Sequence, residues 1–343
     1  MILAMENKGT NTVVTFGEIL MRLSPAENRK LQQTNSLDFF FGGTELNVAA
    51  SLSKFGMQVS HISNLPDDFI GEAALGKLRQ YGIDVAHINL VEQPIGLYFL
   101  EIGSGMRSTQ TSYNRLHGSF AHITPEGVNW EKALDGKKYF HWTGISPAIS
   151  EGAYHTLREG LKEAEKRGMQ VTADPAYRKN LWKYGKQGQE VLAELVGMSS
   201  IFIGGVNEVN EILNTEFIND KKGFIAASKE LMQRFPGINR VFDKVRTGLS
   251  ASWQKIYGQA WTGSEYLQTQ EYEISHVIDR IGTGDAYAAG LIYGLEHFGD
   301  QKSLEFATAA CALKHSIVGD TNLVSVQEVL EVVNGDLGGR IKR

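Results

Sequence analysis

The residues whose types and spacing could do chemistry lie at positions 282–286, which read Gly-Thr-Gly-Asp-Ala. Gly282 and Gly284 leave the backbone free to adopt positive φ angles and let its N–H groups approach a ligand closely. Asp285 adds a carboxylate directly beside them. A phosphoryl-transfer enzyme needs a cradle for phosphate oxygens and a base for the accepting hydroxyl. The segment therefore predicts a phosphate site with an adjacent base.

The stretches on either side of this segment are consistent with a ligand site but do not prove one. A strand-like stretch, Glu273–Ile278, precedes the segment. A strongly helical stretch, Ala286–His297, begins at its last residue. A helix N-terminus directs unsatisfied N–H groups and a positive dipole end at an anion. The same pattern also fits a plain turn with a helix N-cap. A second feature is needed to decide between these interpretations.

A glycine pair far upstream supplies that second feature. Gly42 and Gly43 follow three phenylalanines at 39–41 and open a helix of small residues that continues to Phe55. Bare backbone at a helix start lets a ligand rest against it. Asn47, one turn into the helix, offers both a donor and an acceptor. A helix cap with close packing is the alternative interpretation of the pair.

Taken together, the two segments resemble the paired signatures of the ribokinase-type (PfkB) sugar kinases. In that family an N-terminal Gly-Gly-x-x-x-Asn segment binds the sugar, and a C-terminal Asp-Thr-x-Gly-Ala-Gly-Asp segment holds the phosphate and the base. The resemblance extends from about Val13 to Val333, although Arg280 and Thr283 replace the usual Thr and Ala of the second signature. It implies that Asp285 is the base, that residues 282–284 hold the transferred phosphoryl group, and that ATP and Mg²⁺ are bound.

A further likeness concerns the sugar. Residues 174–182 resemble a segment of the 2-keto-3-deoxygluconate kinases, in which the arginine at the place of Arg178 meets the cleft. Tyr98, Tyr113 and Arg115 are similar to positions of the same subfamily. This substrate carries a carboxylate, which a guanidinium group binds through two parallel hydrogen bonds that lysine cannot match. The resemblance implies phosphorylation of the sugar acid at its 6-hydroxyl, with these residues holding it: Gly42, Gly43, Asn47, Tyr98, Tyr113, Arg115, Arg178 and Asp285.

Two rival functions are also considered. One is a fructokinase or another sugar or sugar-acid kinase of the same family. The other is a sugar sensor that kept the pocket and lost catalysis, against which the retained Asp285 argues, because a sensor needs no base. An aspartate at a helix N-terminus is expected to be ionised at neutral pH and thus a weak base. A loose phosphoryl transition state tolerates a weak base, because it needs orientation of the hydroxyl more than its deprotonation.

The nucleotide half of the expected site is assigned from the resemblance alone. Residues 206–211 lie where the family keeps an Asn-x-x-Glu segment that helps to order Mg²⁺, but Asn210 stands at the Glu position. The magnesium role therefore falls to Glu208, to Glu211 or to water. Residues 243–248 look like the strand end and loop that flank ATP, and Asp279 resembles an aspartate near a monovalent-cation (K⁺) site. The expected nucleotide contacts are Asn207, Lys244, Arg246, Thr247, Gly248, Gly282 and Gly284.

The elements that must position these residues alternate along the chain. Short β-branched or aromatic stretches at 13–16, 59–65, 139–145, 170–173, 201–204 and 240–245 are separated by segments of helical periodicity, clearest at 154–166, 190–196 and 224–235. This alternation predicts an α/β, ribokinase-like fold with a central, mainly parallel sheet sandwiched by helices. Two stretches, at about 18–41 and 96–120, look like strands without intervening helices and are expected to form a small β-sheet lid.

Composition bounds the organisation and the partners. The chain has 343 residues, of which 42% are hydrophobic, and is expected to form one kinase domain over 12–343 after a disordered extension at 1–11. A net charge of −5 argues against nucleic acid and anionic membranes as partners. A single cysteine, Cys311, and the lack of a long apolar run favour a cytoplasmic protein. The apolar faces expected on the lid predict a homodimer or larger homo-oligomer formed through it.

Overall fold

The structure, a computed structural model, describes residues 12–338 and contains a ten-stranded mixed sheet. Neighbouring strands from β11 to β5 are parallel, whereas β11, β12 and β13 pair antiparallel, and β14 pairs with β12. In spatial order the strands are β13 (Tyr266–Gln268), β12 (Gln254–Trp261), β11 (Arg240–Gly248), β10 (Ile201–Ile203), β9 (Gln170–Asp174), β8 (Tyr139–Thr143), β1 (Thr12–Phe16), β4 (Gln58–Pro66) and β5 (Ile88–Val91), with β14 (Tyr272–Ile274) beside β12.

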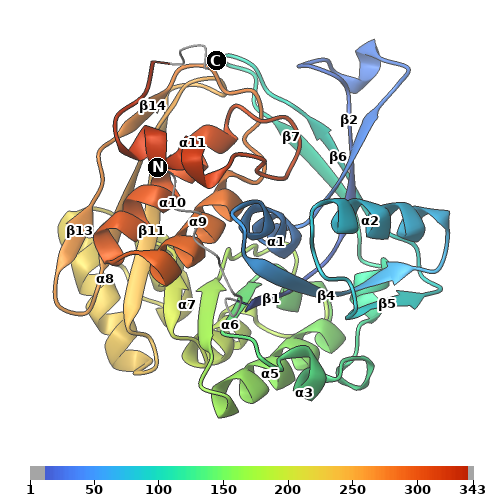
Figure 1. Cartoon of the computed structure of the whole chain (residues 1–343), viewed down its shortest axis with the longest axis horizontal. Coiled ribbons are helices and arrows are strands. Elements are labelled where there is room, and N and C mark those ends of the chain that lie inside the picture. The colour runs from blue at the N-terminus through green and yellow to red at the C-terminus, as the bar shows by residue number, and fades with distance from the viewer. Residues whose placement is uncertain (1–11, 339–343) are drawn as a thin grey trace, which may run out of the picture.

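Helices cover both faces of this sheet (Figure 1). One group is α1 (Thr44–Lys54), α2 (Phe69–Gln80), α9 (Thr283–His297), α10 (Asp300–Lys314) and α11 (Val326–Val333). The other group is α3 (Trp130–Ala133), α5 (Glu151–Lys166), α6 (Gly188–Gly197), α7 (Val206–Leu213) and α8 (Lys221–Arg234). Short helical turns complete the list: α4 (Ser146–Ile149), η1 (Leu31–Gln33), η2 (Ser119–His122) and η3 (Pro125–Gly127).

Two large hydrophobic clusters form the core, one on each face of the large sheet, and a third, small cluster of Leu20, Tyr98 and Leu100 lies at the small sheet. Along β1, Val13 packs with α1 and α9, whereas Val14 and Phe16 pack with α5 and α6. Successive side chains of a strand point to opposite faces, so a strand that is covered on both sides is apolar at consecutive positions. Consecutive residues of β1 and β4 are accordingly buried, with polar side chains such as Thr15 and His61 interspersed among the apolar ones. Burial on both faces confirms the expected ribokinase-like sandwich.

A four-stranded small sheet projects from the edge of the main body (Figure 1). Its strands are β3 (Asp38–Gly42), β2 (Leu20–Ser24), β6 (Gly96–Glu101) and β7 (Gln110–Asn114), in that spatial order. β2 pairs antiparallel with β3 and parallel with β6, and β6 pairs antiparallel with β7. The small sheet is built from the two stretches in which the sequence predicted strands without intervening helices.

Most expected elements coincide with observed ones, but the stretch before the phosphate segment differs. The strand expected at Glu273–Ile278 ends at Ile274. Beyond it, the N–H groups of Ile278 and Asp279 both donate to the carbonyl of His315, which follows α10, and so cannot join a strand ladder. The helix expected from Ala286 begins at Thr283. The residues between Ile274 and the phosphate segment therefore form an irregular connection, which is hydrogen-bonded to the end of α10.

Two remaining expectations can be compared with the structure only in part. The extension expected over residues 1–11 lies outside the described residues. Within 12–338, every helix is too short or too polar to cross a bilayer.

Candidate active site

A cavity of about 600 Å³ lies at the carboxyl ends of the parallel strands, between the large sheet and the small sheet. Asp174 ends β9, Gly205 follows β10, and Lys244 lies in β11, while Tyr98 and Tyr113 come from the small sheet. Open α/β sheets bind ligands at this edge, because the loops and helix N-termini that follow the strands converge there. The cavity is the natural place for the chemistry that the glycine segments predict.

The structure brings most of the expected site residues to this cavity. Those that line it are Gly43, Asn47, Tyr98, Tyr113, Arg115, Arg178, Asn207, Glu208, Lys244, Arg246, Thr283, Gly284 and Asp285. Those that do not line it are Gly42, Glu211, Thr247, Gly248, Asp279 and Gly282. Gly42 and Gly282 are adjacent in sequence to residues that line the cavity, and they affect it through the backbone conformation at the two helix starts. The other four need separate explanations, given below.

The first turn of α9 forms an anion-binding site at the cavity. Gly282 is the N-cap, with φ 77° and ψ 3°, and a β-carbon there would lie 1.8 Å from the carbonyl oxygen of Asp320. Only glycine combines this conformation with such a close approach. Helical hydrogen bonding starts with the N–H of Ala286, which donates to Gly282 O at 2.9 Å. The preceding N–H groups of Gly284 and Asp285 therefore have no intrahelical acceptor.

Asp285 faces the cavity from the first turn of α9, and its carboxyl is buried. Its pKa is raised to about 8, chiefly because burial disfavours the charged form; the hydrogen bond from Asn47 lowers the pKa, and the nearby carboxylates of Asp174, Glu45 and Asp320 raise it. The expectation that Asp285 is fully ionised at neutral pH is therefore wrong for the ligand-free protein. Loss of hydration outweighs the favourable position at the helix N-terminus. A carboxyl with this pKa is a stronger proton acceptor than an ordinary aspartate.

Asn47 joins the two glycine segments. Its Nδ2 donates to Asp285 Oδ2 at 2.7 Å, while its buried Oδ1 has no partner among the described residues. The amide is thus oriented by Asp285, and its Oδ1 remains able to accept a hydrogen bond at the cavity. Gly43, the N-cap of α1, has φ 152°, and a β-carbon there would lie 2.0 Å from Glu18 O, so this helix start packs closely against the connection between β1 and β2.

The two arginines expected to bind the sugar acid have different surroundings. Arg115 is buried, and its Nε donates to Glu18 Oε2 at 2.7 Å, while a second nitrogen pairs with the same oxygen. Arg115 was expected to bind the carboxylate of the sugar acid as Arg178 does. That expectation needs correction, because Glu18 already neutralises the charge of Arg115. Arg178 is exposed at the cavity, donates to Tyr177 O at 3.1 Å, and forms no ion pair within residues 12–338. The guanidinium available to a carboxylate is that of Arg178.

The small sheet contributes an aromatic wall. The rings of Tyr98 and Tyr113 stack with their centroids 5.5 Å apart, and the Arg115 guanidinium lies over Tyr113, 5.4 Å from its centroid. The Tyr98 hydroxyl donates to Asp320. Tyr98 is therefore held in one orientation, whereas the half-exposed Tyr113 closes the outer side of the cavity.

The nucleotide side differs from the expectation at several positions. Glu208 faces the cavity and accepts from Gly205 N at 2.9 Å, whereas Glu211 points elsewhere. Asn210 bonds both the N–H and the carbonyl of Phe217, at 2.9 Å each, so this residue is structural. Thr247 and Gly248 were expected in a loop but pair with β12 as the end of β11, because that strand runs on to Gly248.

Sequence reasoning missed several acidic residues that line the cavity. Glu45 is buried, accepts from Thr143 Oγ1 at 2.9 Å and Ser146 Oγ at 2.6 Å, and has a pKa raised to about 7 by burial. Burial also raises the pKa values of Asp174 and Asp243 to about 6. Asp320 follows α10 in a Gly-Asp-Thr-Asn run, a turn-like polar signal that could have indicated a functional loop.

The balance of charge in the cavity bears on what it can bind. Seven acidic residues line it, namely Glu18, Glu45, Asp174, Glu208, Asp243, Asp285 and Asp320, against four basic ones, namely Arg115, Arg178, Lys244 and Arg246. Glu18 and Asp320 are paired with arginines, and burial raises the pKa values of Glu45 and Asp285, so the carboxylates left to oppose a polyphosphate are Asp174, Glu208 and Asp243, which a bound cation would neutralise. Among residues 12–338, no cluster of three or more His, Cys, Asp or Glu residues could hold a metal ion by itself. Carboxylates that line the cavity without forming a complete metal site suit Mg²⁺, which proteins commonly bind through one or two carboxylates together with phosphate oxygens.

Comparison with known proteins decides the family. A model of the pfkB family carbohydrate kinases matches residues 10–325. The chain belongs to this family. Within it, the chain is 27% identical over 332 residues to the 2-dehydro-3-deoxygalactonokinase of Haloferax volcanii, covering 96% of this chain and 99% of the relative. It is 25% identical over 312 residues to the 5-dehydro-2-deoxygluconokinase of Clostridium tetani, covering 88% and 86%.

A solved pfkB-family structure gives the same result in three dimensions. The 2-dehydro-3-deoxygluconokinase of Thermotoga maritima superposes with a TM-score of 0.90 at 33% identity, covering 95% of this chain and 100% of that one. All three of these relatives are named as kinases of a dehydro-deoxy gluconate or galactonate. The superposition agrees with the family assignment of this chain as a pfkB family carbohydrate kinase.

Proposed function

We propose that this protein transfers the γ-phosphoryl group of ATP to the 6-hydroxyl of 2-keto-3-deoxygluconate. The observation that carries the proposal is the pairing, in one cavity, of an exposed Arg178 with the buried base Asp285 beside the α9 N-terminus. The first group suits a carboxylate, and the second suits a hydroxyl about to be phosphorylated. The relatives named for keto-deoxy acids support this substrate class.

The residues divide the reaction between them. Arg178 binds the carboxylate in a planar, two-pronged manner. Asn47 offers its Oδ1 to a sugar hydroxyl and keeps the Asp285 carboxylate oriented through its Nδ2. Asp285 accepts the proton of the 6-hydroxyl as the oxygen attacks phosphorus. The N–H groups of Gly284 and Asp285 stabilise the negative charge on the transferred group.

The nucleotide occupies the side of the cavity lined by Asn207, Glu208, Lys244 and Arg246. A solved structure that shares this fold is described as a complex with ATP and Mg²⁺. When bound, Mg²⁺ supplies neutralising charge between the phosphates and the acidic wall. Glu208 and Asp243 would hold it, because Glu208 is close enough to Asp243 and Asp174 to raise the pKa of both carboxyls. A cation would relieve that repulsion.

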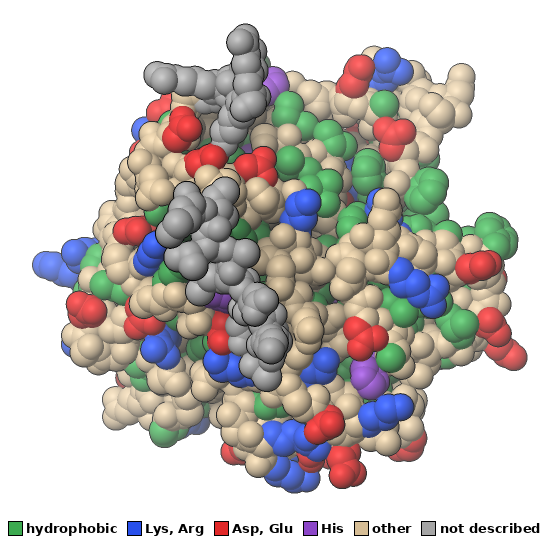
Figure 2. All heavy atoms as spheres, in the orientation of Figure 1, with side chains coloured by type: hydrophobic (Ala, Val, Ile, Leu, Met, Phe, Trp, Pro, Cys, Tyr) green, Lys and Arg blue, Asp and Glu red, His purple; other side chains and the backbone are tan. Residues whose placement is uncertain are grey.

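The small sheet acts in this proposal as a lid and as a dimer interface. Its cavity face carries Tyr98, whereas its opposite face is apolar, formed by Met21, Leu23, Phe39, Phe41, Leu97 and Phe99 at aligned positions of β2, β3 and β6. Phe39 is 56% exposed. Hydrophobic side chains gather where the small sheet rises above α2 (Figure 2). A second copy that covers this face would remove the exposed apolar surface and rigidify the lid over the cavity.

Measurement of ADP release over a panel of acceptors tests the proposal. The panel contains 2-keto-3-deoxygluconate, its galacto epimer, 5-dehydro-2-deoxygluconate, fructose and ribose. We expect kcat/KM to be highest for 2-keto-3-deoxygluconate and at least about tenfold lower for the neutral sugars, since a charge-assisted bond contributes about 1.5–3 kcal/mol. A preference for fructose would favour the rival fructokinase, and no turnover of any acceptor would favour the sensor.

A further inference from the structure

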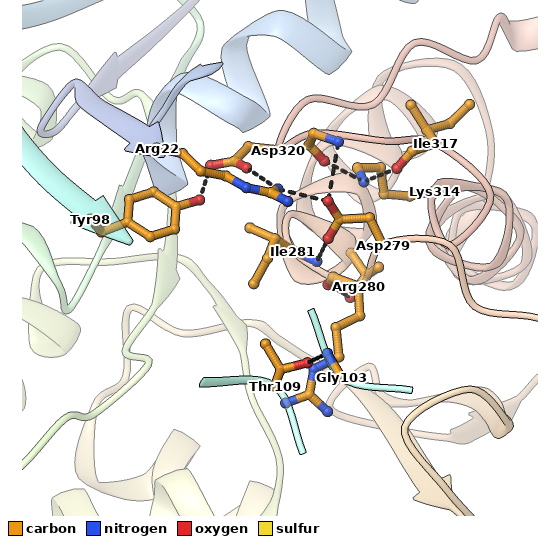
Figure 3. A network of polar contacts seen from close by, with 12 residues as sticks. Arg22, Tyr98, Gly103, Thr109, Asp279, Arg280, Ile281, Lys314, Ile317 and Asp320 are labelled. Atoms are coloured by element: carbon orange, nitrogen blue, oxygen red, sulfur yellow. Dashed lines mark hydrogen bonds and ion pairs between the residues drawn. The ribbon is translucent and has the colours of Figure 1, made fainter. Parts of the chain in front are cut away.

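Four buried charged side chains form a network directly behind the anion-binding turn (Figure 3). Arg22 Nη1 lies 2.7 Å from Asp279 Oδ2 and 2.8 Å from Asp320 Oδ1. Lys314, the last residue of α10, is fully buried nearby; burial lowers the pKa of its ammonium, and the carboxylates of Asp279 and Asp320 oppose that shift. Two carboxylates and two cations give the network no net charge. Burying charges is costly unless they are balanced, and here they balance in number, although Arg22 Nε and Nη2 have no hydrogen-bond partner within residues 12–338.

The Lys314 ammonium is held by backbone oxygens. Its Nζ donates to Ile317 O and to Gly319 O, each at 2.9 Å. Carbonyl oxygens that converge on one point, with carboxylates nearby, are a ligand set suited to a hard cation. Here the tip of a lysine side chain, a compact positive charge, lies at that point.

The aspartate that was expected beside a monovalent cation is fully engaged. Asp279 Oδ1 accepts from Ile281 N at 3.0 Å, and Oδ2 accepts from Gly319 N at 3.1 Å besides pairing with Arg22. Both oxygens thus have partners. The residues around Asp279 therefore do not fit an added K⁺, because protein cations already satisfy the oxygens that would bind it.

The network is in contact with the catalytic turn. A β-carbon at Gly282 would lie 1.8 Å from Asp320 O and 3.4 Å from Lys314 Cε, so the backbone at the start of α9 rests on this network. Asp320 also accepts from Tyr98, which lines the sugar side of the cavity. A cation at this place fixes residues 317–320, and these in turn fix both the anion-binding turn and the aromatic wall.

We infer that Lys314 is a built-in replacement for an exchangeable monovalent cation, so that phosphoryl transfer by this protein does not depend on K⁺. Lys314 is a positioning residue in this account, since it touches neither substrate. The inference concerns the site of the proposed function and uses that function for one of two readouts. The other readout, thermal stability, needs no substrate and stands even if the acceptor differs from the one proposed.

The native protein gives the first test. Its unfolding temperature and its rate are measured in potassium, ammonium, sodium and tetramethylammonium chlorides at equal ionic strength. We expect the rates in all four salts to agree within about twofold and the unfolding temperatures to be the same. If no cation binds specifically, the salts act only by screening charges, and at equal ionic strength that screening is the same. Activation of the native protein by K⁺ of tenfold or more, or a rise in unfolding temperature specific to K⁺, would overturn the inference.

Removal of the lysine gives the second test. Lys314→Ala vacates the cation position, so we expect a lower unfolding temperature and a lower rate in tetramethylammonium, with both recovering in K⁺ or NH₄⁺. Lys314→Met fills the space without charge, and its losses should not be recovered by any salt. Lys302→Ala, an exposed position of the same helix, serves as the control and should show no salt selectivity. A folded Lys314→Ala protein with native rates, or with losses that K⁺ and NH₄⁺ leave unchanged, would show that the ammonium does not act as a cation substitute.

Discussion

The hydrogen bond between Asn47 and Asp285 should set the pH at which the protein becomes active. In the ligand-free protein Asp285 has a pKa of about 8, and the bond from Asn47 Nδ2, 2.7 Å long, lowers that value. A hydrogen bond to a charged group contributes about 1.5–3 kcal/mol. At 1.36 kcal/mol for each pKa unit, loss of the donor should raise the pKa of Asp285 by about one to two units.

The variant Asn47→Leu tests this reasoning. We expect the acid limb of kcat/KM, measured from initial rates with both substrates below saturation, to move from a midpoint of about 8 to about 9–10. At pH 7 the rate should therefore fall by about tenfold to a hundredfold from this cause alone, and part of the loss should return as pH rises. Product formation is followed by quenched sampling, because coupling enzymes fail at high pH.

Ser51→Ala is the matched control for Asn47→Leu. Ser51 lies one turn further along α1, and its Oγ donates to Asn47 O at 2.9 Å without touching Asp285. The midpoint of this control should stay where it is in the native protein. A uniform loss of activity in Asn47→Leu, with the midpoint unchanged, would refute the role of Asn47 in setting the pKa and leave it only a sugar contact.

Four further predictions concern the site and the small sheet. Asp285→Asn should lower kcat by about 10²–10⁴, and near-native turnover would remove Asp285 from the role of base. The same change should raise the unfolding temperature at pH 8 but not near pH 4. The pKa of Asp285 is about 8 in the folded protein and about 3.9 in the unfolded chain, so ionisation of Asp285 destabilises the fold as pH rises from about 4 to 8. Asparagine has no such ionisation. Arg178→Lys should raise KM for the sugar acid by tenfold or more. Arg115→Lys should mainly lower the stability of the fold, because it weakens the ion pair with buried Glu18. Equal effects of the two substitutions on KM would contradict the different surroundings of the two arginines. Phe99→Asp should convert a dimer to a monomer in sedimentation and raise KM, and a native protein that already sediments as a monomer with normal rates would exclude the dimer.

The fold could be predicted because its signals are local. The alternation of apolar strands and periodic helices fixes the sandwich, and the two glycine segments lie at helix starts, where their conformational freedom is needed. The strand expected up to Ile278 failed because a partner 37 residues later, His315, accepts from its backbone. Local propensity carries no information about such a partner.

The charges of the site could not be predicted for the same reason. Arg115 appeared as a second carboxylate ligand until Glu18, distant in the chain, proved to be its partner. Asp279 suggested a cation site, but Arg22 reaches it from the small sheet and Lys314 supplies the ammonium nearby. The pKa of Asp285 depends on burial by several elements. Residue types and spacing indicate candidate chemistry, whereas tertiary contacts decide which charges remain available to a ligand.

One measurement tests the central claim most directly. The native protein and Asp285→Asn are incubated with 2-keto-3-deoxygluconate, ATP and Mg²⁺, and the product is examined by ³¹P NMR with coupling to the sugar protons. The account predicts a single phosphate monoester coupled to the two protons at C6, formed by the native protein and at least about a hundredfold more slowly by Asp285→Asn. A phosphate on another hydroxyl, or no sugar phosphate although ATP and the acid both bind, would contradict the account.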